Sequence, residues 1–314
     1  MANTGTINRN QLPIGTVVDG YAIQKLLGSG GFSLIYLGED LHDLSPVVIK
    51  QFLPERFTRK QVDENGAARK DQKPRQIDVG RDHFYEEAKA LAALHHPNIV
   101  NVRSFFCIDE SAFLVMDYHT GKNLATYVKE QQGGLSEEFL LKVFPPLLDA
   151  LRLIHSKSFL HLDIKPANIH VRPGGHPLLL DFGAVHQMSR GKRLIGPVVT
   201  PGFAPVEQYY SSGNVGPWSD LYAIGATMRA CIEGKPPPPA IRRDADDEME
   251  PAATKFRRDY SASLLEALDW AMSIDPHARP QTVDALLNVL PTSVKRAPFS
   301  RRKPLEDILT EAGS

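Results

Sequence analysis

The hydrophobic pattern of this 314-residue chain changes near Gly121 from mainly strand-like to mainly helical, and that change limits the folds available to it. In residues 21–53, apolar and β-branched side chains alternate in three runs, with a glycine cluster between the first two, as in antiparallel strands joined by a tight turn. Residues 99–109 and 111–118 contain two further strand-like runs. Beyond Gly121, apolar residues recur mainly with helical spacing. The sequence therefore predicts an α+β protein, with a small antiparallel β lobe followed by a larger, mainly helical lobe.

One helix is predicted within the β-rich part. Phe84, Ala88, Leu91 and Ala92 form a single apolar stripe, which favours a helix over 83–94. In the second part, the same reasoning predicts helices over 136–156, 220–233, 262–274 and 281–290, the first with Ser136 as its N-cap.

These patterns divide the chain into segments. Residues 1–20 are a predicted flexible lead-in, 21–117 the first lobe and 118–290 the second. Residues 54–82 are polar and predict an exposed insertion in the first lobe. The tail, 291–314, is basic and then carries a short apolar stripe. It either docks on this chain or a partner, or it is an unstructured basic tail.

Composition narrows the class of protein. Lysine and arginine number 36 and aspartate and glutamate 37, so the formal net charge is −1 and gives no global field for gripping nucleic acid or an anionic membrane. No run of about 18 apolar residues is present, so we expect no membrane span. Residues 1–15 are polar and lack the apolar region of a signal peptide. Cys107 and Cys231 have apolar neighbours and are predicted core thiols of a reducing compartment. A cytoplasmic protein is expected.

Two features of the first lobe suit phosphate binding. The glycine-rich loop from Gly28 to Ser33 lies between strands, where glycines let backbone N–H groups approach phosphates, although an ordinary hairpin turn explains it equally well. Lys50 ends a β-branched strand, and Glu87 lies on the inward side of the predicted helix. A Lys–Glu pair can hold the ammonium against phosphate oxygens, whereas a lysine at a strand end is otherwise a solvated surface residue.

The strongest signal is a pair of polar loops in series. Residues 161–168 read HLDIKPAN and place a carboxylate, a lysine and an amide at Asp163, Lys165 and Asn168. An apolar strand then leads to Asp181, thirteen residues after Asn168, and an aspartate at a strand end offers a hard oxygen ligand to magnesium. Either loop alone could be a turn with polar caps, but both at this spacing indicate a catalytic site.

At these residues the sequence resembles the eukaryotic-type protein kinases, from about Tyr21 to Leu290. The stretches TPGFAPVEQY, GPWSDLYAIGAT and DPHARP are most similar to bacterial serine/threonine kinases. The resemblance implies a bilobal kinase fold in which a nucleotide binds between the lobes.

The resemblance implies an ATP site and its parts. The glycine-rich loop would cover the phosphates, Lys50 would contact the α- and β-phosphates while paired with Glu87, and the backbone of 117–119 would bind the adenine edge. The implied ATP-binding residues are Leu27, Gly28, Ser29, Gly30, Gly31, Phe32, Ser33, Ile35, Val48, Lys50, Glu87, Met116, Asp117, Tyr118 and His119.

It also implies a division of catalytic roles. Asp163 would orient the attacking hydroxyl and accept its proton, and Lys165 would steady the γ-phosphate. Asn168 and Asp181 would hold two Mg²⁺ ions, with Mn²⁺ as an alternative. Thr200 would help to place the substrate hydroxyl of a serine or threonine in a protein. Two structural roles are implied as well: Asp220 would brace the catalytic loop, and Glu207 would pair with Arg279.

One departure from the family pattern concerns regulation. Leu162 stands where many kinases carry an arginine that binds the phosphate of a phosphorylated activation loop, and leucine cannot pair with a dianion. We therefore expect activity without phosphorylation of that loop. Ser189, in a basic stretch, is a candidate phosphorylation site.

Two other functions fit parts of this pattern. A pseudokinase or nucleotide-binding signalling module would keep the fold without catalysis, although Lys50, Glu87, Asp163, Asn168 and Asp181 are all present. A small-molecule phosphotransferase would use the same Asp and Asn spacing but generally lacks the long segment between Asp181 and Glu207.

Overall fold

The computed structural model describes residues 11–29, 33–53, 84–85, 87–109, 111–182, 186–187, 199–210, 213–293 and 305–310. The chain divides into two units, one built from residues up to Ala93 with Asn101–Tyr118, the other from Leu94–Val100 with the chain from His119 onward. The predicted insertion 54–82, Ser189, and the loop residues Gly30, Gly31 and Phe32 lie outside the described residues.

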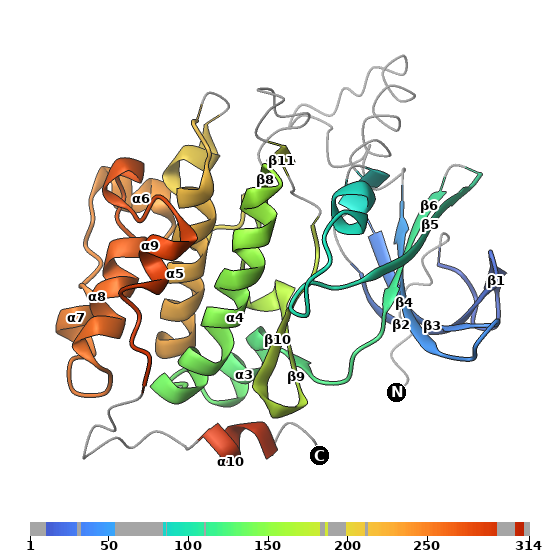
Figure 1. Cartoon of the computed structure of the whole chain (residues 1–314), viewed down its shortest axis with the longest axis horizontal. Helices are drawn as coiled ribbons and strands as arrows, with labels where there is room; N and C mark the ends of the chain where they lie inside the picture. The colour runs from blue at the N-terminus through green and yellow to red at the C-terminus, as the bar shows by residue number, and fades with distance from the viewer. Residues whose placement is uncertain are drawn as a thin grey trace, which may run out of the picture. The chain divides into compact units, whose positions relative to one another are not determined.

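The first unit is built on one antiparallel sheet of six strands in the order β1-β2-β3-β4-β6-β5 (Figure 1). Apart from the two-residue strand β1, these are the strands that alternation predicted. The strands are β1 (Val17–Val18), β2 (Tyr21–Ser29), β3 (Ser33–Asp40), β4 (Pro46–Phe52), β5 (Val102–Ile108) and β6 (Ser111–Asp117).

Central strands β3, β4 and β6 supply most of the core of this unit. Tyr36, Val47 and Ile49 are fully buried, as expected for β-branched and aromatic side chains on the covered face of a sheet. Residues 84–85 and 87–92 are helical, within the predicted 83–94. Phe84 of this helix packs on Phe52 of β4, with ring centroids 5.7 Å apart, so an aromatic contact joins helix and sheet.

The second unit is mainly helical (Figure 1). Its helices are α3 (Leu124–Glu130), α4 (Glu137–Ser156), α5 (Pro217–Glu233), α6 (Ala240–Ala245), α7 (Ala252–Lys255), α8 (Ala262–Ala271), α9 (Val283–Leu287) and α10 (Leu305–Thr310), with short 3₁₀ turns η2 (Pro166–Asn168), η3 (Pro173–Gly175), η5 (Val206–Tyr209) and η6 (Pro276–Ala278). Its strands are β7 (Lys122–Asn123), β8 (Phe159–Leu160), β9 (Ile169–Arg172), β10 (His176–Leu179) and β11 (His186–Gln187), which form the sheets β10-β9-β7 and β11-β8.

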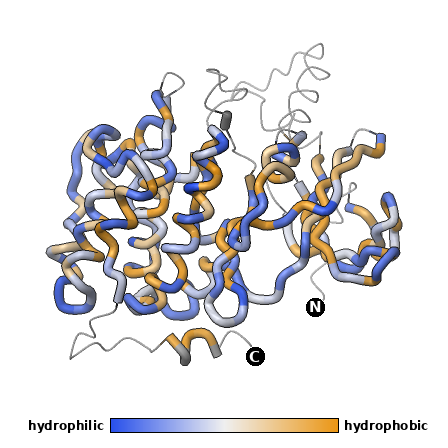
Figure 2. Tube along the Cα trace, viewed as in Figure 1, coloured by the Kyte–Doolittle hydropathy of each residue, from blue (hydrophilic) through white to orange (hydrophobic). Residues whose placement is uncertain are grey.

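Helices α4 and α5 form the centre of this unit and carry much of its apolar sequence (Figure 2). The predicted N-cap of α4 is confirmed, because Ser136 Oγ accepts a hydrogen bond from the backbone N–H of Phe139 at 3.2 Å. Helix α5 packs against α8 at Gly225, where a Cβ would meet the Cβ of Ala271 at 2.9 Å. Only glycine allows the two helices to approach so closely.

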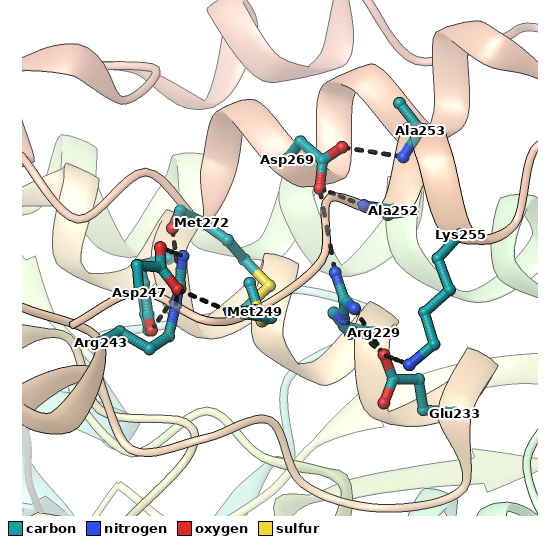
Figure 3. Close-up of polar contacts among 11 residues, drawn as sticks. Arg229, Glu233, Arg243, Asp247, Met249, Ala252, Ala253, Lys255, Asp269 and Met272 are labelled. Carbon is teal, nitrogen blue, oxygen red and sulfur yellow. Dashed lines mark hydrogen bonds and ion pairs between the residues drawn. The ribbon is translucent and has the colours of Figure 1, made fainter.

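Charged side chains fasten the short helices α6 and α7 to α5 and α8 (Figure 3). Arg243 of α6 donates to the backbone carbonyl of Met272 at 3.0 Å and pairs with Asp247 at 2.9 Å. Asp269 of α8 accepts hydrogen bonds from the backbone N–H groups of Ala252 and Ala253, at 2.7 and 2.9 Å, at the start of α7. These tertiary contacts stabilise helices too short to form alone.

Two sequence predictions have different outcomes at the cysteines. Cys231 is buried in α5, as predicted. The prediction for Cys107 is wrong, because this residue is exposed: β5 is an edge strand and its flanking apolar residues do not cover it. Among the described residues, no helix is both long and apolar enough to cross a bilayer.

Candidate functional site

Three predicted catalytic side chains and the predicted substrate-positioning residue Thr200 form one hydrogen-bonded cluster in the second unit. Lys165 Nζ lies 2.9 and 2.7 Å from the two carboxylate oxygens of Asp163 and 3.1 Å from Thr200 Oγ1. The Thr200 hydroxyl donates to Asp163 Oδ1 at 2.7 Å, and Asn168 Nδ2 donates to Asp163 Oδ2 at 3.0 Å. Asp163 is therefore held by three donors from two separate segments.

A buried carboxylate holds the backbone of the loop that carries Asp163. Asp220 of α5 is fully buried and accepts hydrogen bonds from the backbone N–H groups of His161 at 3.0 Å and Leu162 at 2.8 Å. Gln208 Nε2 donates to the carbonyl oxygen of Leu162 at 2.6 Å. These bonds hold Leu162 at φ +59°, a left-handed conformation that leucine rarely adopts. The bracing role that the resemblance implied for Asp220 is thus present in the geometry.

Asp220 is itself held by a histidine. His155 Nε2, in the last turn of α4, lies 2.8 Å from Asp220 Oδ2. Burial alone raises the pKa of the Asp220 carboxyl, but the hydrogen bond and charge of His155, with the N–H groups of the loop, hold it below its usual value. The carboxylate is ionised and able to accept all of these bonds.

Asn168 directly precedes β9 and Asp181 follows the end of β10, so the two residues lie at neighbouring strand ends. The backbone N–H of Leu180 donates to the carbonyl of Asn168 at 2.8 Å, so the end of β10 is bonded to the start of β9 and Asp181 follows directly. Asp181 has φ +37°, another uncommon backbone conformation. Asn168 directs its amide nitrogen to Asp163, which turns its Oδ1 away as an acceptor. One amide oxygen and one carboxylate fit Mg²⁺, which is usually held by one or two carboxylates with waters and phosphates.

Two aromatic residues close the buried side of this site. His161 and Phe182 are both fully buried, with ring centroids 4.8 Å apart. His161 Nε2 lies 3.4 Å from the carbonyl oxygen of Leu180. The packing therefore ties the loop of Asp163 to the segment of Asp181.

In the first unit, the expected Lys–Glu pair is present. Lys50 Nζ donates to Glu87 Oε1 at 2.6 Å, and the side chains are only 9% and 4% exposed. Lys50 lies opposite Ile35 in the sheet, and its Nζ is 5.7 Å from the ring centroid of Phe84. Because both side chains are buried, each charge is stabilised by the other.

The other described nucleotide-binding candidates lie on the same sheet or directly after its strand β6. Val48 of β4 pairs in register with Met116 of β6. Leu27, Gly28 and Ser29 end β2, and Ser33 begins β3. Asp117 ends β6 and is followed by Tyr118 and His119. Most of the described site residues thus form two groups, one on the sheet and helix of the first unit and the other around Asp163 in the second, and His119 also belongs to the second unit.

A second buried ion pair fastens the segment that contains Thr200. Arg279 donates to the two carboxylate oxygens of Glu207 at 2.8 and 3.1 Å, as the resemblance implied, and Ser219 Oγ donates to Glu207 at 2.7 Å. The guanidinium also stacks on Tyr222, with Cζ 4.8 Å from the ring centroid.

Three residues of the site were not predicted from sequence. His155 and Gln208 act through partners far along the chain, and Arg103 of β5 donates to Asp117 at the end of β6. Histidine in the last turn of a predicted helix was the only available signal for His155, and none pointed to the other two.

A family model described as "Protein kinase domain" matches residues 21–289 of the chain. The chain belongs to the protein kinase family. The solved structure "PpkA-294 apo form" matches 90% of this kinase chain and 100% of its own, with a TM-score of 0.76 and 30% identity. The predicted α+β kinase fold is therefore confirmed.

Curated relatives of this kinase chain are serine/threonine kinases, many of them bacterial. Serine/threonine-protein kinase PknA of Nostoc sp. (strain PCC 7120 / SAG 25.82 / UTEX 2576) is 30% identical over 295 residues, which are 88% of this chain and 48% of that protein. Serine/threonine-protein kinase D of Synechocystis sp. (strain ATCC 27184 / PCC 6803 / Kazusa) is 30% identical over 286 residues, 87% of this chain and 52% of that protein. The chain thus spans about half the length of these relatives.

Proposed function

We propose that this kinase transfers the γ-phosphate of ATP to serine and threonine hydroxyls of protein substrates. The observation that carries the proposal is the cluster around Asp163, in which Lys165, Asn168 and Thr200 hold the carboxylate. Such an array holds the carboxylate in one orientation, as is required of a base that must be aimed at a hydroxyl.

Asp163 and Lys165 have complementary roles in the proposed reaction. Asp163 accepts the proton of the attacking hydroxyl, and its fixed position aligns that oxygen with the phosphorus. Lys165 Nζ, at 2.7 Å from Asp163, contributes positive charge beside the transferred phosphoryl group, whose oxygens become more negative as the bond to the leaving group breaks. Thr200 keeps both side chains in place.

Asn168 and Asp181 are the proposed ligands of two Mg²⁺ ions, with Mn²⁺ as an alternative. A bound divalent ion neutralises negative charge on the phosphates. Asn168 is held for this role by its bonds to Asp163, and Asp181 by the end of β10. In the first unit, Lys50 contacts the α- and β-phosphates while Glu87 holds its ammonium, and the backbone of 117–119 binds the adenine.

The test is transfer of radiolabelled phosphate from ATP with Mg²⁺ to a peptide that contains serine and threonine. Wild type and Asp163→Asn are compared, with binding of a fluorescent ATP analogue measured for both. We expect transfer to fall by about 10²-fold or more in the variant, in line with loss of a general base, while ATP binding is kept. Equal transfer would exclude catalysis by this site, and binding without transfer in the wild type would favour a nucleotide-binding module.

We also propose that activity does not require phosphorylation of the loop around Ser189. The support comes from Leu162, which is buried, carries no charge and is fixed by bonds from Asp220 and Gln208 to its backbone. Protein treated with phosphatase should keep most of its activity, and loss of most of it would contradict this proposal.

The remaining parts of the proposal concern location and the tail. A cytoplasmic location stays a prediction. For the tail, α10 supports docking on the kinase itself: Ile308 is 2% exposed, and a Cβ at Gly175 of η3 would meet Leu309 Cδ1 at 3.2 Å.

A further inference from the structure

An arginine on an edge strand of the first unit joins three segments of the sheet. Arg103 of β5 donates through Nε to Asp117 Oδ1 at 2.5 Å and through Nη1 to Ser45 Oγ at 2.6 Å. Asp117 ends β6, and Ser45 lies in the turn between β3 and β4. One guanidinium therefore ties the start of the proposed adenine-binding segment to a turn of the sheet.

The backbone around Arg103 is shaped to aim this side chain. The pairing of β5 with β6 shifts register between Val102 and Ser104, so Arg103 lies at a β-bulge. Bulges bend a strand and redirect a side chain, at a cost in ladder hydrogen bonds. Such a bulge is expected where the direction of one side chain matters.

Arg103 also lies among three carboxylates. Its Nη1 lies 3.6 Å from Asp40 Oδ2 and 3.7 Å from Asp43 Oδ2, in addition to the bond with Asp117. The hydrogen bond to Asp117 raises the pKa of the guanidinium above its usual value, despite partial burial. Removing Arg103 would take this positive charge away from Asp40, Asp43 and Asp117, and repulsion among the carboxylates would push Asp117 away from the turn.

Asn101 also holds Asp117 in place. The backbone N–H of Asp117 donates to the carbonyl of Asn101 at 3.1 Å, and Asn101 Nδ2 donates to Asp117 Oδ2 at 3.0 Å. The carboxylate therefore has a donor on each oxygen, one neutral and one charged. The charged hydrogen bond is the stronger of the two types.

We infer that Arg103 is a positioning residue for adenine, because it fixes Asp117 against the turn between β3 and β4 and so sets the backbone that contacts the base. The inference rests on the proposed function, since it requires that the backbone at Asp117 binds ATP. The effect is expected on nucleotide affinity and not on the chemical step, because the bonds that the structure describes for Arg103 go to Asp117 and Ser45. Small displacements of positioning groups are costly when a ligand is read by backbone hydrogen bonds.

The experiment measures binding of a ribose-labelled fluorescent ATP, and its displacement by inorganic tripolyphosphate, which lacks the base. Arg103→Met is compared with Arg103→Lys and with Arg242→Met, which removes an arginine that is 74% exposed. We expect Arg103→Met to weaken binding of the labelled ATP about tenfold, as for loss of a charge-assisted hydrogen bond, with the tripolyphosphate constant unchanged. Arg103→Lys should recover part of the affinity, and Arg242→Met should equal wild type.

A further variant tests the electrostatic explanation. Adding Asp43→Asn to Arg103→Met removes one of the facing carboxylates and should restore part of the ATP affinity. In steady-state assays, Arg103→Met should raise KM for ATP while kcat and KM for the peptide stay unchanged. A merely structural role would change all of these together.

The outcomes distinguish failure of the positioning role of Arg103 from failure of the proposed function. Equal ATP affinity in Arg103→Met and wild type, or parallel loss of ATP and tripolyphosphate binding, overturns the positioning role alone. If Arg103→Met does not fold, Arg103→Lys decides: weaker binding of ATP with an unchanged tripolyphosphate constant supports the positioning role, and wild-type affinity for ATP or parallel loss of both ligands contradicts it. A wild type that binds no nucleotide overturns the proposed function, and the positioning role with it.

Discussion

His155 Nε2 lies 2.8 Å from Asp220 Oδ2, and this contact joins the last turn of α4 to the first turn of α5 beneath the catalytic loop. The same carboxylate accepts the backbone N–H groups of His161 and Leu162. Two helices and the loop therefore share one buried anion, so the position of Asp163 depends on a residue that is not part of the reaction.

Asp220→Asn should test this arrangement. The amide oxygen can accept one of the two loop N–H groups, but the amide nitrogen would face the other, which leaves a buried donor unpaired. We expect a loss of about 1–3 kcal/mol in the free energy of unfolding, together with a fall in kcat. Urea unfolding and phosphate transfer measure the two effects, and an unchanged variant in both would contradict the bracing role.

The contribution of the Asp220 carboxylate to the stability of the folded protein changes with pH in a definite direction. The pKa of Asp220 is lower in the folded protein than its ordinary value of 3.8, because the bonds from His155 and the loop outweigh the effect of burial. The stabilising contribution is therefore complete above that ordinary value and is lost as pH falls through the lower folded pKa. Unfolding of wild type and Asp220→Asn from about pH 2 to about pH 7, which covers the acid side of the ordinary aspartate value, should show a difference that shrinks only at the acid end.

The buried pair of Lys50 and Glu87 leads to a second prediction. Lys50→Met removes the ammonium that pairs with the Glu87 carboxylate, whose side chain is only 4% exposed. We expect a loss of about 3–5 kcal/mol in stability, and loss of ATP binding. The double variant Lys50→Met/Glu87→Leu should recover much of the stability but none of the ATP binding.

That comparison separates structure from function at Lys50. Denaturant unfolding gives the stability of each variant, and titration with a fluorescent ATP analogue gives binding. If the double variant also recovers ATP binding, Lys50 does not contact the phosphates.

The sequence predicted the parts of the fold that have strong periodicity. The alternation in residues 21–53 found β2, β3 and β4, and the apolar stripe of 136–156 with its serine cap found α4 almost to the residue. Both patterns repeat over many residues, so the local sequence shows which face of each strand or helix is buried.

Elements that depend on distant contacts were not predicted. Helices α6 and α7 are short and charged, and they are stable because Arg243 and Asp269 bond them to α5 and α8. The exposure of Cys107 depends on β5 being an edge strand, which is a property of strand order and not of the local sequence.

The same distinction holds at the site. Asp163, Lys165 and Asn168 share one short motif and could be found together, whereas Gln208 and Arg103 act on Leu162 and Asp117 through the fold alone. Supporting residues therefore require the structure, even where the residues they support are evident from sequence.

Thr200 allows the proposed catalytic arrangement to be tested without removing a charge. Its hydroxyl donates to Asp163 Oδ1 at 2.7 Å and lies 3.1 Å from Lys165 Nζ, so it fixes the distance between base and cation. Thr200→Val keeps the shape of the side chain but removes both hydrogen bonds, and Thr200→Ser keeps the hydroxyl. We expect kcat to fall about 10- to 100-fold in Thr200→Val, as for loss of one or two positioning hydrogen bonds, and to stay near wild type in Thr200→Ser.

Affinity for ATP should be the same in both Thr200 variants, because Thr200 contacts only Asp163 and Lys165 among the described residues of the cluster. Steady-state kinetics with varied ATP and varied peptide would separate the two parameters. A Thr200→Val variant with wild-type kcat would show that Asp163 is held well enough by Lys165 and Asn168 alone, and the proposed part of the hydroxyl in positioning the base would have to be abandoned.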